Sequence, residues 1–126
     1  MAKAEALAKQ EKIMVPTDFV WQGSKIADIG PDTVERYIGI LGDSRTVFWA
    51  GDMGIAEQPA YAAGTKKLGQ LLAEPHKGIR MIGGGDTATA LKTMGLLDKM
   101  DFTSTGGGAA LEYLAGQSLP GLKALD

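Results

Sequence analysis

Residues 78–100, GIRMIGGGDTATALKTMGLLDKM, carry the clearest structural pattern in the sequence. This stretch begins with a short β-prone run and passes through three glycines, Gly83, Gly84 and Gly85. It then continues with the spacing of apolar residues that is typical of an amphipathic helix. This order predicts a strand, a tight turn and a helix in succession.

The same order recurs on both sides of this stretch. TVFWAGDMG, residues 46–54, precedes a helical pattern at about residues 58–73, and DFTSTGGGAALEYLAG, residues 101–116, repeats strand, glycines and helix. Such alternation predicts βαβ units and a parallel sheet, with ligands bound at the carboxyl ends of the strands. The expected fold class is therefore α/β, with a partial Rossmann-like parallel sheet of about four strands flanked by helices.

The amino-terminal third follows this order less regularly. Residues 2–10 are rich in Ala, Glu and Lys and predict a helix, and the KIMV segment that follows predicts a short strand. Residues 18–30 show no clean period and are expected to be mostly loop. Pro31 suits the first turn of a helix over residues 32–41. The four expected strands start at Ile13, Thr46, Ile79 and Asp101.

The composition is that of an ordinary soluble globular domain. The chain has 126 residues, 44% hydrophobic and 22% charged, so we expect one folded unit over residues 1–126. A formal net charge of −2 offers no basic surface for nucleic acid, and no apolar run reaches the roughly 18 residues of a membrane span. The chain has no cysteine. These features argue against a nucleic-acid or membrane partner and favour a cytoplasmic protein.

The GGGDT motif offers groups that can bind a phosphate together with a cation. The amides of Gly83, Gly84 and Gly85 stand at an expected helix start, where the helix dipole favours an anion. Asp86 would repel a phosphate, so its expected partner is a divalent cation such as Mg²⁺, and Thr87 adds a hydroxyl. Taken alone, the motif fits equally well a turn that needs glycine and a helix that begins with a capping Asp. The P-loop pattern G-x-x-x-x-G-K-[ST] is absent, which excludes that kind of site.

A second glycine cluster strengthens the phosphate hypothesis. STGGGA places Gly106, Gly107 and Gly108 at the start of the next expected helix, on the neighbouring strand. Two adjacent helix N-termini at one crevice predict a cradle for a polyphosphate. Glu57 follows the first strand of this group, where its carboxylate could either complement the helix dipole or accept a hydrogen bond from a ribose hydroxyl.

Taken together, five stretches resemble the carboxyl-terminal part of phosphoglycerate kinase. They are, in chain order, DIGPDT, TVFWAGDMGIAE, GTKKL, RMIGGGDTATAL and DFTSTGGGAALEYLAGQSLPGLKAL, and the resemblance runs from about Ala2 to the last residue. It implies a nucleotide-binding domain for Mg-ADP or Mg-ATP. It also implies a phosphotransferase of glycolysis that moves a phosphoryl group between 1,3-bisphosphoglycerate and ADP, with a separate amino-terminal domain for the phosphoglycerate.

The resemblance also implies residue roles. Asp86 would take the Mg²⁺ of the nucleotide, Thr87 would contact its phosphates and Glu57 would hold its ribose. The backbone amides of Gly106, Gly107 and Gly108 would be catalytic and would stabilise the phosphoryl group during transfer. A side chain at these glycines would occupy the space that the migrating group needs.

The chain departs from the family pattern in one important loop. Members usually read W-N-G-P-M-G-x-F-E, whereas this chain has Ala50 for Asn, Asp52 for Pro and Ala56 for Phe. Asp52 adds a negative charge near a bound polyanion, which would weaken nucleotide binding unless the carboxylate faces solvent. The substrate domain and the first part of the nucleotide-binding domain have no counterpart here, so we expect no useful kinase activity from the chain alone.

Two other functions are compatible with the residues. The chain could be a non-catalytic nucleotide- or anion-binding module that self-associates, because the expected strand around Val47 would have an open apolar edge. Its partner would then be a second copy of the chain in place of the missing amino-terminal portion of the enzyme. A nicotinamide-binding protein would need an acidic residue about 20 positions after the glycines, where Asp98 and Asp101 are only loosely placed.

Overall fold

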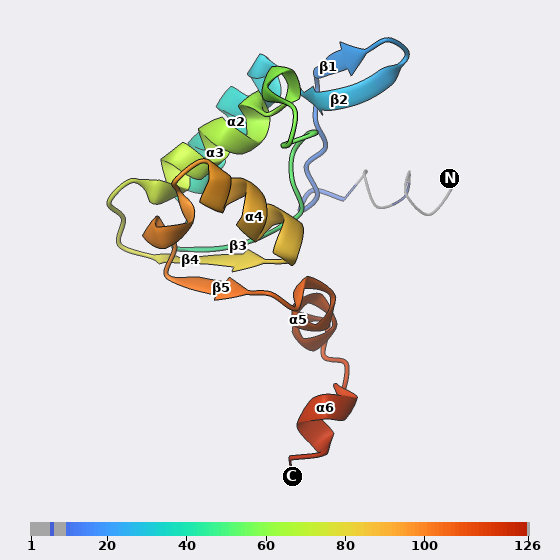
Figure 1. Ribbon diagram of the computed structural model, residues 1–126, viewed down its shortest axis with the longest axis vertical. Helices are drawn as coiled ribbons and strands as arrows, with labels where there is room; N and C mark the ends of the chain where they lie inside the picture. The colour runs from blue at the N-terminus through green and yellow to red at the C-terminus, as the bar shows by residue number, and fades with distance from the viewer. Residues whose placement is uncertain (1–5, 7–9, 126) are drawn as a thin grey trace.

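The computed structural model describes residue 6 and residues 10–125. The expected helix over residues 2–10 therefore falls almost entirely outside the described residues. The remaining elements follow one another from the amino to the carboxyl end of the chain (Figure 1). They are β1 (Phe19–Gln22), β2 (Lys25–Ile29), α2 (Pro31–Gly42), β3 (Thr46–Ala50), α3 (Ala63–Ala73), β4 (Ile79–Gly83), α4 (Gly85–Thr93), β5 (Phe102–Ser104), α5 (Gly107–Leu114) and α6 (Pro120–Lys123), with short 3₁₀ turns at Pro59–Tyr61 and Leu97–Lys99.

Three strands form a parallel sheet in the order β3-β4-β5, which confirms the predicted α/β fold. Thr46 lies opposite Ile79, and Met81 lies opposite Phe102. The expected first strand, starting at Ile13, is wrong, because this segment pairs with no strand in the described part of the chain. Ile13 instead donates its amide hydrogen to the Gln10 carbonyl in a turn. The segment ends at a proline that has no amide hydrogen to continue a ladder.

Residues 18–30 form a β-hairpin, so the expectation of a loop there is also wrong. β1 and β2 pair antiparallel and form a separate two-stranded sheet that projects from the rest of the molecule (Figure 1). Gly23 takes a φ of 60° in the turn between them. A register shift between Val20 and Trp21 interrupts the alternation of the side chains, which explains why the sequence shows no clean period.

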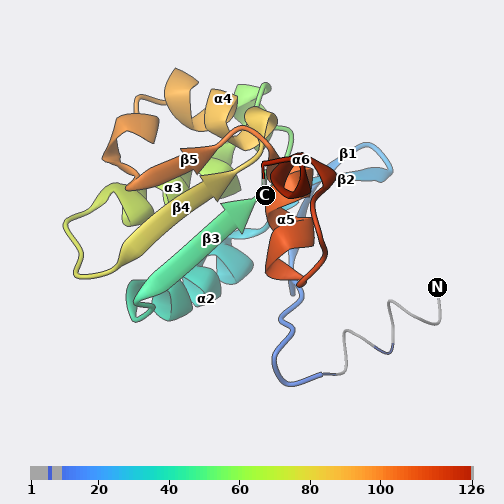
Figure 2. The same cartoon turned by 90° about the horizontal axis from the view of Figure 1, so that it is seen from below.

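The helices α2, α3 and α4 all lie on one face of the three-stranded sheet (Figures 1 and 2). This face carries the hydrophobic core, in which apolar side chains of the strands meet those of the helices. The core residues are Ile29, Val34, Val47, Trp49, Leu68, Leu72, Ile82, Ala88 and Leu91. The hydrophobic effect of this one layer is what holds the sheet and the helices together.

The opposite face of the sheet is open. The prediction that the run 46–49 is buried on both faces is wrong, because Val47 and Trp49 are buried but Phe48 is only half-buried. Ile79 and Phe102, on the same open face, are 51% and 60% exposed. Parallel sheets in complete domains are covered on both faces. The open face is therefore a surface that a further part of the protein or a partner can cover.

Asp18 fixes the start of α2 from the segment before β1. Its carboxylate accepts hydrogen bonds from the amides of Asp32 at 3.0 Å and Thr33 at 2.7 Å, as well as from the Thr33 hydroxyl. These bonds lower the pKa of Asp18, with the Thr33 hydroxyl as the largest cause. Pro31 occupies the first turn as the sequence predicts. This cap joins the hairpin to the helical layer, because Asp18 directly precedes β1 whereas the amides that donate to it belong to α2.

Candidate functional site

The glycine clusters lie where the parallel strands end. The Gly84 amide at the end of β4 donates to the Ser104 carbonyl of β5 at 2.8 Å. A Cβ built on Gly107 would lie 2.8 Å from the Cα of Gly84, so the two backbones touch. The expected juxtaposition of the two glycine turns at the carboxyl ends of neighbouring strands is therefore present in the structure.

Several of these glycines are required by the fold itself. Gly84 has a φ of 108°, a conformation that other residues rarely adopt. A Cβ on Gly83 would lie 2.4 Å from the Phe48 ring, and one on Gly107 would collide with the Gly84 backbone. At these three positions any side chain would clash or strain the chain, so geometry alone accounts for glycine.

Three other glycines have no such requirement within the described structure. None of Gly85, Gly106 and Gly108 has a positive φ. A Cβ on Gly85 or Gly108 would meet no atom of the described residues within 4 Å, and one on Gly106 would meet only the Ala109 Cβ at 3.7 Å. The space beside these backbones is open. Their bare amides stand at the starts of α4 and α5, where a ligand can approach them.

The loop of residues 51–58, which follows β3, is held firmly beside these turns. Gly51 takes a φ of 101°, and its carbonyl accepts a hydrogen bond from the Trp49 indole at 2.6 Å. Three further bonds fix the loop from other elements, and each uses a backbone amide of the loop as donor. They run from Gly51 to the Thr87 hydroxyl, from Met53 to the Thr65 hydroxyl and from Ile55 to the Ala27 carbonyl, at 2.9, 3.0 and 2.9 Å.

Thr87 is buried below the surface on which a ligand would lie. It is 1% exposed, and its hydroxyl accepts the hydrogen bond from the Gly51 amide. In this arrangement Thr87 joins α4 to the loop after β3.

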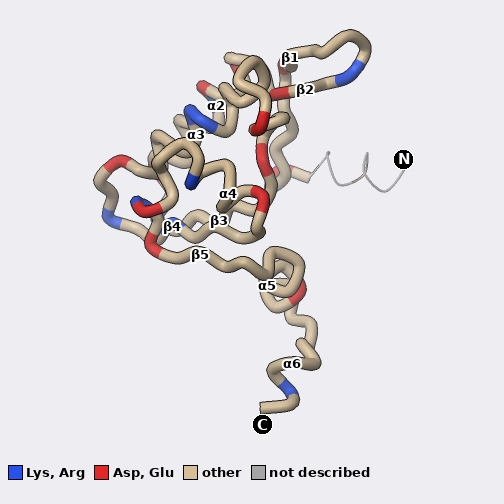
Figure 3. Tube along the Cα trace, viewed as in Figure 1, with Lys and Arg blue, Asp and Glu red and all other residues tan. Residues whose placement is uncertain are grey.

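Acidic residues gather around the loop after β3 and the start of α4 (Figure 3). Glu57 and Asp86 are both exposed and line one cavity of about 300 Å³, so the structure brings these two predicted site residues together. Burial raises the pKa of the nearby Asp52, and the charges of Glu57 and Asp86 add to the rise, while hydrogen bonding to Thr87 opposes it. One oxygen of the Asp52 carboxylate is buried without a hydrogen-bond partner in the described structure. Asp52 is therefore unfavourable as an anion in this position.

The fold and these turns match one protein family in sequence. A family model described as phosphoglycerate kinase matches residues 1–117 of the chain. The chain belongs to the phosphoglycerate kinase family. Phosphoglycerate kinases from Herpetosiphon aurantiacus and from Mycobacterium sp. strain KMS are 47% and 43% identical to it over 109 and 125 residues. These alignments cover 86% and 97% of this chain but only 27% and 31% of the two relatives.

Solved structures of phosphoglycerate kinases agree with this assignment. The enzyme from Coxiella burnetii matches with a TM-score of 0.71 and 39% identity, and the enzyme from Pyrococcus horikoshii OT3 with 0.72 and 36%. The matches cover 79% and 80% of this chain, and 25% and 24% of those structures. The chain thus spans about a quarter to a third of the phosphoglycerate kinases that it matches.

The described residues of this phosphoglycerate kinase chain contain no group of three or more His, Cys, Asp or Glu side chains arranged to hold a metal ion. Mg²⁺ is usually held by one or two carboxylates together with phosphate oxygens. Asp86, exposed in the first turn of α4, can supply one such carboxylate beside the open glycine amides. The donor set therefore fits a metal ion that arrives with a nucleotide.

Two buried polar residues, Asp28 and Thr65, hold the segments around the loop of residues 51–58, and the sequence predicts a role for neither. Asp28, 1% exposed, accepts hydrogen bonds from the amides of Ile29 and Gly64 at 2.8 and 2.9 Å and so caps α3. Thr65, fully buried, accepts from Met53. Asp28 belongs to the DIGP motif and Thr65 to GTKKL, so the family motifs marked them while the local pattern gave no reason for their identity.

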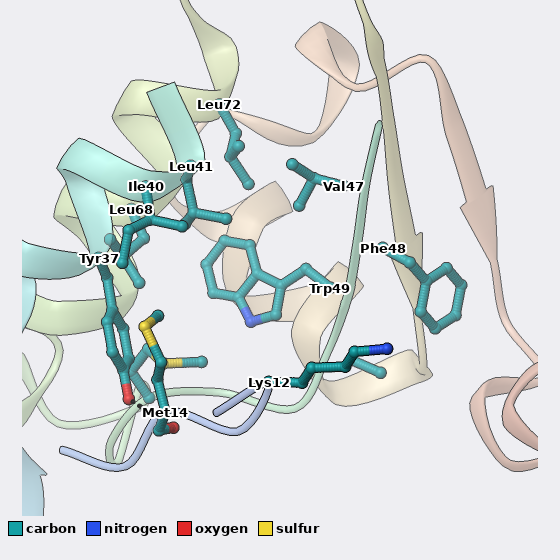
Figure 4. A pocket seen from close by; sticks show the side chains of 12 residues that line it. Lys12, Met14, Tyr37, Ile40, Leu41, Val47, Phe48, Trp49, Leu68 and Leu72 are labelled. Carbon is teal, nitrogen blue, oxygen red and sulfur yellow. Dashed lines mark hydrogen bonds between the residues drawn. The ribbon is translucent and has the colours of Figure 1, made fainter. Parts of the chain in front are cut away.

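A larger cavity, of about 370 Å³, lies beside β3, on the side where the described chain provides no neighbouring strand. Trp49 lies at its centre among apolar side chains of α2 and α3, and Phe48 points to the other side of the strand (Figure 4). Lys12 and Met14 also line it, and the Met14 carbonyl accepts a hydrogen bond from the Tyr37 hydroxyl at 3.4 Å. The segment expected as the first strand therefore lies near β3 without pairing with it.

The sequence predicts no membrane-spanning segment. Among the described residues, no helix has the length and apolar character needed to cross a bilayer.

Proposed function

We propose that this chain is the carboxyl-terminal part of the nucleotide-binding domain of a phosphoglycerate kinase. It binds Mg-ADP or Mg-ATP at the carboxyl ends of β3, β4 and β5. Together with the rest of the enzyme it transfers a phosphoryl group between 1,3-bisphosphoglycerate and ADP in glycolysis. The observation that carries this proposal is the set of three glycines, Gly85, Gly106 and Gly108, at which an added Cβ would meet no close contact and φ is not positive.

In this proposal the backbone amides do the electrostatic work. The amides of Gly83 and Gly85 face the phosphates of the nucleotide, whereas the Gly84 amide already donates to the Ser104 carbonyl. The amides of Gly106, Gly107 and Gly108 stabilise the phosphoryl group during transfer. Phosphoryl transfer depends on positioning and charge stabilisation more than on a protein nucleophile. Bare amides at two touching turns suit that requirement, since they donate hydrogen bonds without filling the space with side chains.

The side chains divide the remaining tasks. Asp86 holds the Mg²⁺ that neutralises the phosphates, and Glu57 accepts hydrogen bonds from the ribose hydroxyls. The resemblance predicts that Thr87 contacts the phosphates. We propose that Thr87 also acts indirectly, because its hydroxyl accepts the hydrogen bond that fixes Gly51. Both carboxylates line one cavity, which supports a single ligand that reaches from one to the other.

A titration of Mg-ADP into the chain tests this assignment. Gly108→Ala should lower the affinity about tenfold, because the methyl group enters the space of the phosphoryl group. Asp86→Asn should abolish the dependence on Mg²⁺. Gly39→Ala is the matched control, since Gly39 also lies in a helix with open space beside it but is on α2. Equal affinities for all variants, with and without metal, would exclude the site.

A second candidate is a non-catalytic nucleotide- or anion-binding module that self-associates. The free side of β3 and the open sheet face with Ile79 and Phe102 favour it, because exposed strand edges and apolar faces recruit partners. Either a second copy of the chain or the missing amino-terminal portion of the enzyme could cover them.

A kinase assay separates the two candidates. The chain alone should show no turnover near the roughly 1–100 s⁻¹ of kinases, because transfer needs both substrates held in line and shielded from water. Addition of a purified amino-terminal portion should restore turnover if the chain is part of the enzyme. Light scattering at micromolar concentration that reports a stable dimer, with no turnover after this addition, would instead favour the binding module.

A further inference from the structure

His76, the single histidine of the chain, lies at the end of the sheet opposite to the glycine turns. It belongs to the segment between α3 and β4, which meets the start of β5 at the amino ends of the strands (Figure 2). Its Nε2 lies 3.1 Å from Oδ2 of Asp101, the residue directly before β5. Its Nδ1 lies 2.9 Å from the carbonyl oxygen of Glu74. One imidazole ring thus contacts two segments that are far apart in the sequence.

The two partners of the ring require a hydrogen on each of its nitrogens. A carbonyl oxygen and a carboxylate oxygen only accept hydrogen bonds, and a neutral imidazole carries a hydrogen on only one nitrogen. The imidazolium form satisfies both contacts, whereas the neutral form loses one of them. The pKa of His76 is raised in agreement with this geometry, first by the hydrogen bond to the Glu74 carbonyl and then by the one to Asp101. Protonated His76 therefore fits this position better than neutral His76.

Two charged groups of the described structure, Asp101 and Arg80, act on the ring. Asp101 stabilises the imidazolium, and its own pKa is lowered, chiefly by the hydrogen bond from the Arg80 amide and next by the one from His76. The Arg80 side chain is buried and opposes the imidazolium by like-charge repulsion. Its Nη1 donates instead to the Ser44 carbonyl at 2.8 Å. The attraction outweighs the repulsion, since the pKa of His76 rises.

Asp101 also holds the start of β5 against β4. Its Oδ2 accepts a hydrogen bond from the Arg80 amide at 2.7 Å, and its own amide donates to the Arg80 carbonyl at 3.0 Å. β5 is only three residues long, and α5 after it buries no residue in the described structure. The contacts at Asp101 therefore matter for keeping this short strand in place.

We propose that protonation of His76 fixes β5 to the segment between α3 and β4, and that loss of this proton loosens β5. The inference is independent of the function proposed above. The folded state holds the proton more tightly than the unfolded chain. The contribution of this contact to stability is therefore complete below pH 6.5 and is lost as the pH rises through the raised pKa of the folded state. β5 leads into the turn where Gly107 touches Gly84, so a looser strand also loosens the contact between the glycine turns.

A nuclear magnetic resonance titration of the full chain tests the inference, since a single histidine gives one set of ring signals. The pKa of His76 should lie above 6.5 in the wild type. Asp101→Asn should lower it, because asparagine keeps an acceptor oxygen but not the charge. The amide signals of Gly107 and Gly108 should move with the same midpoint as the ring. A wild-type pKa at or below 6.5, or glycine signals that do not follow the ring, would overturn the inference.

Hydrogen exchange of the β5 amides provides a second measurement. At pH 6 these amides should be about two- to fivefold better protected in the wild type than in His76→Gln, because glutamine cannot take up the proton. The difference should vanish at pH 9. Lys77→Gln is the matched control, since it removes a positive charge from the next residue, which is exposed, and it should leave the protection unchanged. Equal protection of the wild type and His76→Gln at pH 6 would contradict the inference.

Discussion

The helices α4 and α5 begin alike and are packed very differently. Each follows a parallel strand and a cluster of three glycines. α4 buries Thr87, Ala88 and Leu91 in the layer that covers the sheet. In the described structure α5 buries no residue, and Leu111 and Leu114 are 51% and 62% exposed. The same local motif is thus followed by a packed helix at α4 and by an unpacked helix at α5.

The comparison shows that the geometry of a glycine turn and the packing of the helix that follows it are separable. The turn before α5 is placed by contact with Gly84 at its first residue, and the rest of the helix adds little. The backbone geometry of the site can therefore exist in this chain while the apolar side chains of α5 and the open face of the sheet stay uncovered.

Truncation of one leucine in each helix should give the largest contrast in stability. Leu91→Ala should lower the free energy of unfolding by about 2–5 kcal/mol, because Leu91 is fully buried in the core. Leu111→Ala should change it by no more than about 0.5 kcal/mol, because that side chain is half exposed. Urea denaturation of the two variants measures both values. Similar losses would mean that α5 is packed as firmly as α4.

Alanine at two adjacent glycines should have opposite and smaller effects. Gly107→Ala should destabilise the chain by about 1–3 kcal/mol, because its methyl group collides with the Gly84 backbone. Gly108→Ala should be neutral or stabilising by up to about 1 kcal/mol, because it has open space and a helical backbone. Thermal unfolding followed by circular dichroism gives both signs. A loss at Gly108 equal to that at Gly107 would contradict the assignment of different reasons to the two glycines.

Removal of the Asp52 charge should give the smallest change, a gain in stability that depends on pH. The pKa of Asp52 is raised in the folded state, chiefly by burial, above its ordinary value of 3.8. The folded state therefore holds the proton more tightly than the unfolded chain, and stability falls as the pH rises from 3.8 through the folded-state pKa. Asp52→Asn should be more stable than the wild type at pH 7 and should lose this advantage below pH 3.8.

Urea midpoints of both proteins between pH 3 and 8 measure this effect. Glu112→Gln, on the exposed side of α5, removes one carboxylate without a buried environment and serves as the control. A difference between Asp52→Asn and the wild type that does not vary with pH would contradict the explanation.

The repeated order of strand, glycines and helix was enough to predict the sheet from the sequence. Strands begin at Thr46 and Ile79 as expected and one residue after Asp101, because their apolar runs and following glycines are local signals. The hairpin could not be predicted, since a register shift at Trp21 breaks its alternation. The prediction of a strand at Ile13 was wrong because a β-prone local sequence does not supply a pairing partner. No described strand pairs with this segment.

The candidate site was predictable where it depends on strand ends and not where it depends on burial. Glu57 and Asp86 follow neighbouring strands and do share one cavity. The burial of Thr87 under the loop, and the buried carboxylate of Asp28, arise from tertiary contacts between segments 36 residues apart. No periodicity in the sequence reports such contacts.

The order of the strands in the sheet bears on how the chain can fold during synthesis. β3, β4 and β5 are neighbours in space in the same order in which they leave the ribosome. Each new strand can therefore pair with the one before it, and no early strand waits for a late partner. The contact between Gly84 and Gly107 forms only when β5 and the start of α5 have joined. The glycine turns before α4 and α5 can thus come together only after β5 has paired with β4.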